Sequence, residues 1–227
     1  MKYRVLGRTG LKVSELGVGG HEYRRPLPTT LGRWGQIDME KFMETQPERT
    51  RLIKRAIEAG VNYFDTTHLE EAKSLGLALR QLEPNGEIHI SIMLLWPFSK
   101  MAEAPRSKWK EIIVAEVEEK LKLIQTDYAD IATILMPERD YKKERLETTL
   151  EALHQFKSEG KIGFVGSSSH ELRFLVELMR HFDCFDMVMI PYNYHQQEAR
   201  DLFFPLARAL EIGVVIIKPF AWPYYGI

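Results

Sequence analysis

The strict alternation of two hydrophobic patterns along the chain constrains its fold more than any other feature. From residue 50 onward, segments with apolar residues at helical spacing, such as Ile113, Val117 and Leu121, alternate with short and nearly continuous apolar runs. Apolar residues spaced three and four apart predict amphipathic helices. The continuous apolar runs predict strands buried on both faces, as in a parallel sheet that is covered by helices.

Seven parallel strands follow from this pattern. They cover residues 16–19, 61–64, 88–95, 131–135, 162–165, 187–190 and 214–217. Gly60, Gly160 and Gly213 each fall between a helix and the next strand, where a glycine C-cap belongs. Strict alternation fits either an open doubly wound sheet or a closed barrel. An open dinucleotide-binding sheet would carry GxGxxG after its first strand, whereas this chain reads GVGGHEYRR, so the pattern favours the barrel.

We therefore predict a single domain over residues 1–227, with an α/β fold of the (β/α)8 TIM-barrel type in which seven strands are present. A seven-stranded parallel sheet would leave two long edges unpaired, so we expect the natural barrel to continue beyond Ile227. Residues 24–48 break the alternation and predict an insertion loop after the first strand. Loops at that end of a barrel border the active-site mouth.

Composition narrows the classes of partner. The 31 Lys and Arg residues nearly offset 32 Asp and Glu residues, and the formal net charge of −1 gives no reason to expect nucleic acid or an anionic membrane as a partner. No apolar stretch approaches the ~20 residues that cross a bilayer. Cys184 is the only cysteine, which excludes a disulfide framework, favours a packing role for this side chain and predicts a reducing, cytoplasmic location.

Several segments resemble the aldo-keto reductase family. The opening YRVLGRTGLKVSELGVGG resembles its N-terminal hairpin and first strand, and GVNYFDTT at 60–67 resembles its second strand. GKIGFVGSSS at 160–169 is similar to the fifth strand, and IPYNYHQQEARDLFFPLARALEIGVV to the sixth strand and the following helix. The resemblance covers nearly the whole chain. It implies a barrel closed at its bottom by a β-hairpin, and NADPH-dependent carbonyl reduction by an Asp, Tyr, Lys and His at its mouth.

This chain retains one of the four catalytic residues that the resemblance implies. Asp65 matches the family's Asp, whereas Met93 and Leu135 stand where the Lys and the His are expected. The Tyr position falls in the loop after Asp65, where Glu70 or His68 stands. A phenol without a neighbouring ammonium keeps a pKa near ~10. Because general acid catalysis contributes ~100- to 10,000-fold, we expect the ordinary reductase mechanism to be severely impaired.

The resemblance also implies changes on the cofactor side. Ser168 and Ser169 correspond to the Ser-Asn pair that holds the nicotinamide carboxamide, while Met189 replaces a Gln and Ile217 replaces the stacking aromatic residue. NADP is the candidate cofactor. The candidate cofactor-binding residues are Ser168, Ser169, Asn193 and Lys218.

Polar side chains follow most of the predicted strands. They are His21, Glu22, Asp65, His68, Glu138, Arg139, Ser168–His170, Asn193, His195 and Lys218. Side chains at the carboxyl ends of barrel strands point into a common pocket, which predicts a small-molecule ligand there. A buried Asp65 without its Lys is costly, so we expect it either to pair with another group, such as Lys218, or to accept backbone hydrogen bonds in a structural role. The candidate catalytic residues are Asp65, His68, Glu70 and Lys218.

Two further groups of residues receive a structural interpretation. The four histidines at the mouth allow a metal hypothesis, but none forms a tightly spaced pair such as HExxH, so they are interpreted as solvated loop histidines and no metal ligand is assigned. The Lys and Glu run at 108–122 is interpreted as the solvated face of a helix.

Three functions remain open. The first is a divergent NAD(P)H-dependent carbonyl oxidoreductase with an altered acid. The second is a non-catalytic relative that keeps the barrel as a binding or regulatory subunit for a protein partner. The third is a lyase or isomerase that uses mouth residues such as His68 or Lys218. Loss of several cooperating residues on an intact scaffold favours the second, whereas family membership alone favours the first.

Overall fold

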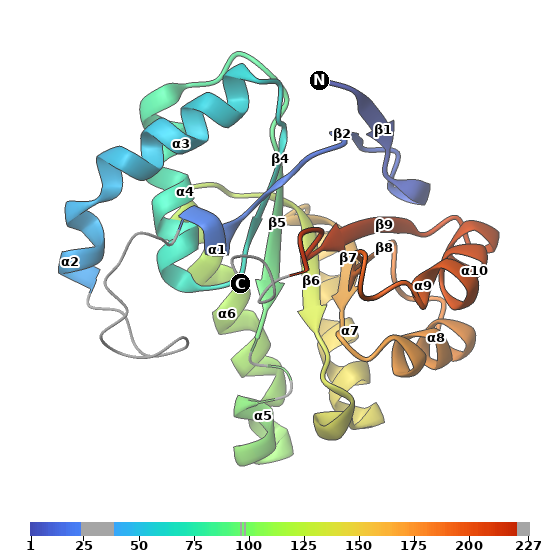
Figure 1. Cartoon of the computed structure of the whole chain (residues 1–227). Helices are drawn as coiled ribbons and strands as arrows, with labels where there is room; N and C mark the ends of the chain where they lie inside the picture. Colours follow the sequence, from blue (N-terminus) through green and yellow to red (C-terminus); the bar gives the residue numbers. More distant parts are fainter. Residues whose placement is uncertain (24–38, 96, 98, 222–227) are drawn as a thin grey trace.

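A curled, seven-stranded parallel sheet forms the centre of the structure (Figure 1). The computed structural model describes residues 1–23, 39–95, 97 and 99–221. The strands are neighbours in sequence order: β3 (Val18–Gly19), β4 (Tyr63–Thr66), β5 (His89–Leu94), β6 (Ala129–Leu135), β7 (Ile162–Ser168), β8 (Met187–Pro191) and β9 (Gly213–Ile217). In the described part of the chain, β3 and β9 are the edges of the sheet. The fold is therefore an incomplete (β/α)8 barrel, as the alternation predicts.

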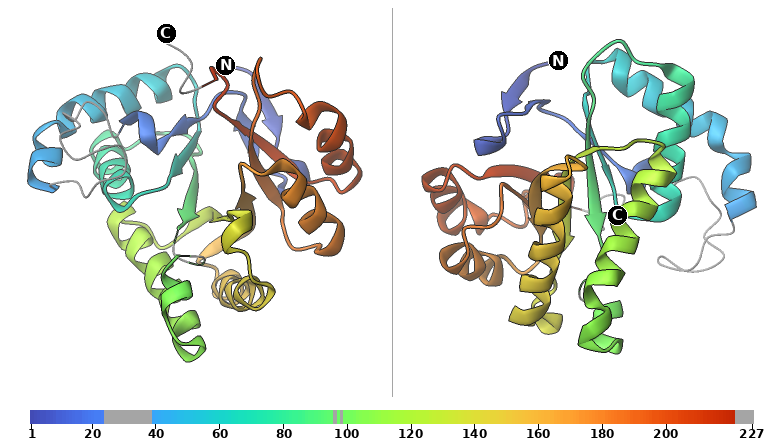
Figure 2. Two further views of the ribbon diagram at one scale, coloured as in Figure 1. Left: turned by 60° about the horizontal axis from the view of Figure 1, so that its bottom comes forward. Right: turned by 180° about the vertical axis from the view of Figure 1, so that it is seen from behind.

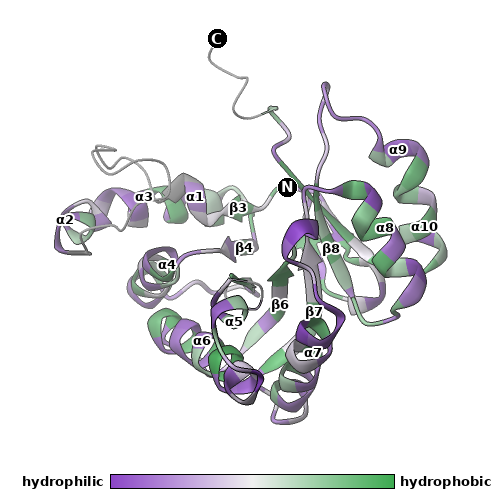
Figure 3. Cartoon of the chain, turned by 90° about the horizontal axis from the view of Figure 1, so that it is seen from below, coloured by the Kyte–Doolittle hydropathy of each residue, from purple (hydrophilic) through white to green (hydrophobic). Residues whose placement is uncertain are grey.

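Helices cover the outer face of the curled sheet (Figures 2 and 3). The longer ones are α3 (Gln46–Glu58), α4 (Leu69–Leu82), α6 (Trp109–Ile124), α7 (Lys143–Ser158) and α8 (Leu172–His181). Shorter ones are α1 (Gly20–Tyr23), α2 (Met39–Glu44), α5 (Lys100–Glu103), α9 (Ala199–Leu202) and α10 (Phe204–Ala209), with 3-10 turns at Gly7–Thr9, Arg106–Lys108 and Glu138–Asp140. No helix among the described residues is both long and apolar enough to cross a membrane.

Two apolar layers lie on the two faces of the sheet. The larger one joins outward strand residues, such as Ile92 and Ile134, to helix residues such as Val117. The smaller one lies inside the curl and includes Tyr63 and Met187. Because successive side chains of a strand alternate between faces, both layers require the continuous apolar runs seen in the sequence.

An N-terminal hairpin bridges the amino ends of the strands. It consists of β1 (Tyr3–Val5) and β2 (Lys12–Ser14), which pair antiparallel. The Tyr3 hydroxyl donates to the Gly60 carbonyl at 2.9 Å, before β4, and the Arg8 N–H donates to the Glu211 carbonyl at 2.6 Å, before β9. The hairpin therefore contacts both sides of the curl at its bottom, as the family resemblance implies.

The glycine predictions are correct at two of three positions. Gly60 and Gly160 follow helices with φ of 89° and 71°. The C-cap prediction for Gly213 is wrong, because Glu211 takes the left-handed conformation instead, with a φ of 55°. Gly213 begins β9, and a Cβ there would come within 2.7 Å of the Leu6 Cγ, so this glycine is required by packing against the hairpin.

Within the predicted insertion loop 24–48, residues 39–48 are mostly helical and not loop. Residues 39–44 form α2, and α3 begins at Gln46, with Pro47 in its first turn. The buried Arg49 guanidinium stacks on the Phe42 ring at 3.6 Å and donates to the Thr45 hydroxyl at 2.6 Å, which fixes the two helices together. The rest of the predicted loop, residues 24–38, lies outside the described residues.

Candidate functional site

Asp65 lies near the end of β4 with its side chain on the inner face of the sheet. It pairs in register with Gly19 of β3 and Ser91 of β5, and it is 8% exposed. Burial raises the pKa of the carboxyl to about 6, in spite of a hydrogen bond with Ser91 that favours the ionised form. The Glu71 charge raises this pKa further. Asp65 is thus a carboxyl that can hold and release a proton near neutral pH.

The lysine whose charge acts on Asp65 is Lys120, from α6. The Lys120 ammonium is fully buried and donates to the Thr67 carbonyl at 2.5 Å. One turn earlier, the buried Glu116 carboxylate accepts from the Leu95 N–H at 2.8 Å. Burial lowers the pKa of Lys120, while the surrounding carboxylates oppose that shift. The carboxylates are Glu116, Glu71, Asp65 and Glu70.

The interpretation of residues 108–122 as a solvated face is therefore wrong at Glu116 and Lys120. Both lie on the side of α6 that faces β5 and α4, together with Val117 and Leu121. A Glu and Lys four residues apart are usually an exposed pair on a helix surface, so the sequence contains no signal for their burial.

Glu71, on the first turn of α4, forms the centre of a second group of side chains. One carboxylate oxygen, Oε2, accepts from the backbone N–H groups of Thr67 at 2.7 Å and His68 at 3.2 Å. The other, Oε1, lies 3.1 Å from the His21 Nδ1 atom. Burial opposes ionisation of this carboxyl, but His21, His68 and the Thr67 N–H hold its pKa below the usual value. The spacing of His68 and Glu71 matches an N-terminal capping box, which is the one sequence signal that could have identified Glu71.

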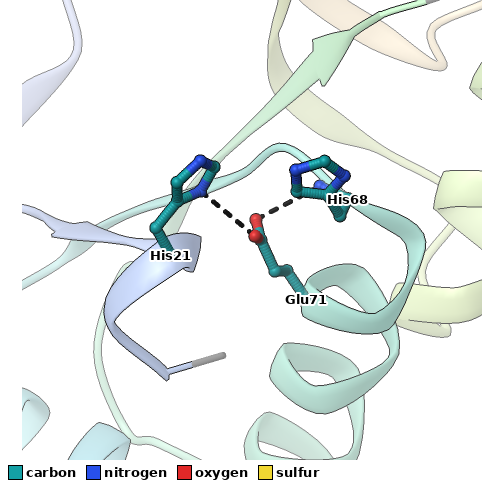
Figure 4. Close-up of side chains that lie close together, drawn as sticks. All are labelled: His21, His68 and Glu71. Carbon is teal, nitrogen blue, oxygen red and sulfur yellow. Dashed lines mark hydrogen bonds and ion pairs between the residues drawn. The ribbon is translucent and has the colours of Figure 1, made fainter. Parts of the chain in front are cut away.

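Figure 4 shows the Glu71 carboxylate between the imidazole rings of His21 and His68. The two ring centroids are 5.4 Å apart. His21 comes from the short helix after β3, and His68 and Glu71 follow β4, so the pairing of these adjacent strands brings them together. Gly20 permits this approach, because a Cβ at that position would lie 2.1 Å from the Glu71 Oε2.

The positions assigned by resemblance to the catalytic Lys and His lie on the inner face of the sheet. Met93 of β5 is 6% exposed and belongs to the inner apolar layer, and Leu135 of β6 packs against that layer. Met189 of β8 is also part of it, and Ile217 of β9 packs on it. The inner face thus presents thioether and alkyl groups at these four positions.

The side chains of two of the four residues predicted to bind the cofactor, Ser169 and Asn193, make local structural contacts. The Ser169 hydroxyl donates to the Glu171 carboxylate at 2.9 Å. The Asn193 side-chain N–H donates to the Lys218 carbonyl at 3.1 Å, and its oxygen accepts from the His195 N–H at 2.9 Å. These bonds shape the loops after β7 and β8.

Ser168 differs from Ser169 and Asn193 in this respect. It is 1% exposed, and its hydroxyl has no hydrogen-bond partner among the described residues. Met189 and Ile217 supply neither an amide nor an aromatic ring. At the positions that the resemblance assigns to nicotinamide contacts, the described residues therefore offer a hydroxyl, a thioether and an alkyl group.

The predicted site residues fall into two groups at the carboxyl ends of different strands of the sheet. Asp65, His68 and Glu70 lie around β4, with Glu71 and Lys120. Ser168, Ser169, Asn193 and Lys218 lie at the ends of β7, β8 and β9. Lys218 is half-buried with a φ of 55°, and after desolvation its charge is the next cause of the lowered pKa of His170. The expected pairing of Asp65 with Lys218 stays a prediction, and the lysine charge that lowers the pKa of Asp65 is that of Lys120.

Comparisons with known proteins agree with the fold and with the resemblance. The model of the Aldo/keto reductase family matches residues 29–224. Aldo-keto reductase YhdN of Bacillus subtilis (strain 168) is 24% identical over 223 residues, which are 95% of this chain and 61% of that protein. A probable voltage-gated potassium channel subunit beta of Oryza sativa subsp. japonica is 24% identical over 234 residues, covering 97% and 64% of the two chains.

A solved structure shows the same arrangement of elements. The holo form of aldo-keto reductase AKR11C1 from Bacillus halodurans superposes with a TM-score of 0.68 at 25% identity, covering 95% of this chain and 65% of that one. The chain spans 61–66% of the length of the curated relatives it matches.

Proposed function

Because the chain belongs to the aldo/keto reductase family, we propose that it is a divergent member that binds a small molecule at the mouth of the barrel and does not perform the family's NAD(P)H-dependent carbonyl reduction. One observation carries this proposal. The inner-face positions assigned to the Lys and His hold Met93 and Leu135, which pack with an apolar layer. An apolar side chain can neither lower the pKa of an acid nor orient a carbonyl by hydrogen bonding.

The charged groups that remain at the mouth support a binding role. Asp65, His68 and Lys218 keep polar chemistry at the carboxyl ends of the strands, where ligands of such barrels bind. A relative of similar identity is described as a potassium channel subunit beta rather than as a reductase. The description of that relative supports the use of such a barrel as a binding or regulatory subunit. A protein partner is then a candidate ligand in addition to a small molecule.

The test is the oxidation of NADPH in the presence of a panel of aldehydes and ketones, followed by absorbance. YhdN of Bacillus subtilis, assayed at the same protein concentration, serves as the active comparison. We expect no carbonyl-dependent rate above the protein-free background for this chain. A rate within about 100-fold of that of YhdN would overturn the proposal, because loss of acid catalysis costs ~100- to 10,000-fold.

A divergent carbonyl oxidoreductase with an altered acid is the second candidate. It is favoured by the pKa of Asp65, which burial raises to about 6. A carboxyl with this pKa can donate a proton to a neighbouring oxygen at neutral pH. If the panel yields a rate, Asp65→Asn must abolish it under this candidate, whereas His195→Ala, which changes an exposed histidine of the mouth, must leave it unchanged.

A further inference from the structure

His21, His68 and Glu71 present three metal-binding groups to one point. One ligand atom from each residue lies within 4.8 Å of the other two. The His21 Nδ1 and Glu71 Oε1 atoms are already 3.1 Å apart. Two ligand atoms on a tetrahedral Zn²⁺ with bonds of about 2.0–2.1 Å are roughly 3.3 Å apart. Closing the group around an ion therefore requires movement of at most about 1.5 Å, which rotation of the imidazole rings can supply.

The central carboxylate is held in place before any ion arrives. Glu71 is fully buried, and its Oε2 is fixed by the N–H groups of Thr67 and His68. Oε1 is thereby directed toward His21, whose side chain is 47% exposed and can adjust. Backbone donors that fix the non-ligating oxygen of a carboxylate are a common support of metal ligands.

The local charge favours a cation. The four carboxylates that act on Lys120 share this one buried ammonium. Their identities are Glu116, Glu71, Asp65 and Glu70. A divalent ion between two neutral imidazoles and Glu71 would take over the charge compensation that His21 and His68 give this buried carboxylate when protonated.

From this geometry and charge we propose that His21, His68 and Glu71 bind a divalent transition-metal ion, with Zn²⁺ as the ion that best fits the ligand set. Two histidines and one carboxylate are a common set for zinc sites that keep a coordination position open. One histidine would be enough to hydrogen-bond the carboxylate. A second imidazole lies on the other side of Glu71 (Figure 4), and this arrangement suits a metal ion bound by all three side chains. The proposal does not depend on the proposed function, because it concerns metal binding alone.

The test is a titration of the tag-free chain, first stripped with a chelator, with Zn²⁺ by calorimetry and with Co²⁺ by visible absorption. We expect one equivalent of metal per chain and d–d bands of four- or five-coordinate Co²⁺. His21→Ala, His68→Ala and Glu71→Gln should each weaken binding by at least about 100-fold. The Glu71→Gln variant keeps an oxygen that accepts the Thr67 N–H, so it preserves the local fold.

His195→Ala and His170→Ala are the matched controls, since both change exposed histidines outside the group. They should bind metal as the unsubstituted chain does. Absence of one-equivalent binding would overturn the proposal. Binding that is equally strong in the His21→Ala and His68→Ala variants, with unchanged circular dichroism, would overturn it as well. NADPH and carbonyls are absent from this experiment, so its failure is distinguishable from a failure of the proposed function.

Discussion

Asp65 carries a carboxyl whose pKa in the folded chain lies above its ordinary value of 3.8, at about 6. The folded state therefore binds this proton more tightly than the unfolded state between about pH 4 and pH 6. Consequently the free energy of unfolding should fall as the pH rises through this window, by up to about 3 kcal/mol from this group alone. Asp65 is buried because β4 lies between β3 and β5, and the lysine whose charge lowers its pKa, Lys120, comes from α6.

The variant Asp65→Asn should lose this part of the pH dependence, because an amide keeps the shape but does not ionise. Urea unfolding in the presence of a chelator, from pH 4.5 to pH 7.5, measures the effect. The variant should become more stable relative to the unsubstituted chain as the pH rises. Parallel stability curves for the two proteins across this range would show that Asp65 titrates normally.

Lys120 and Glu116 are both buried and act on each other by charge, so removing one of them should cost more than removing both charges. Lys120→Met should reduce the free energy of unfolding by about 3 kcal/mol, since it leaves Glu116 and the Thr67 carbonyl without this ammonium. Adding Glu116→Gln should restore part of the loss, because the amide oxygen still accepts from the Leu95 N–H.

Lys122→Met is the control for this pair, since Lys122 is an exposed lysine on the same helix and should change stability by less than about 0.5 kcal/mol. Urea unfolding at pH 7.5 compares the four proteins. Equal effects of Lys120→Met and Lys122→Met would mean that Lys120 is solvated.

At the scale of elements, the contact between α4 and α6 depends on Gly76. A Cβ on this residue would lie 2.3 Å from the carbonyl oxygen of Ile124, at the end of α6. Backbone atoms cannot move aside as a flexible side chain can. Gly76→Ala should therefore destabilise the chain by about 2 kcal/mol, even though alanine gains about 1 kcal/mol over glycine in helix propensity.

Gly86→Ala provides the comparison, because no atom lies within 4 Å of a Cβ at Gly86. This change should alter stability by less than about 0.5 kcal/mol. The midpoint of thermal unfolding, followed by circular dichroism at 222 nm, is a sufficient readout. A midpoint for Gly76→Ala that equals that of Gly86→Ala would exclude the close approach of α4 and α6.

Strands and helices could be predicted from the sequence because their apolar periods are local properties. The run at 131–135 lies within β6, for example, and the run at 187–190 within β8. The helix at 39–44 escaped prediction because it is short and lies among prolines and glycines, and its stability comes from the contact between Phe42 and Arg49. Prediction from local patterns failed where a helix is stabilised by contacts with another element.

At the scale of the whole molecule, the barrel and its bottom hairpin were predictable, whereas the arrangement at the mouth was predictable only in part. Asp65 and His68 follow a recognisable strand, so they could be proposed as site residues. The approach of His21 to Glu71 could not, because it depends on the register in which Gly19 pairs with Asp65. Lys120 reaches the site from a helix face whose sequence looks solvated. The contacts between strands and helices in the folded chain, and not the local composition, create this part of the site.

The central proposal is that this family member keeps the barrel but lacks both the nicotinamide contacts and the acid–base groups needed for ordinary NAD(P)H-dependent carbonyl reduction. An equilibrium titration of the purified chain with NADPH, following the quenching of tryptophan fluorescence, tests it most directly, with YhdN of Bacillus subtilis as the comparison. We expect no saturable quenching of this chain at NADPH concentrations that saturate YhdN. Saturable binding of NADPH in the micromolar range would contradict the claim and would favour the divergent oxidoreductase instead.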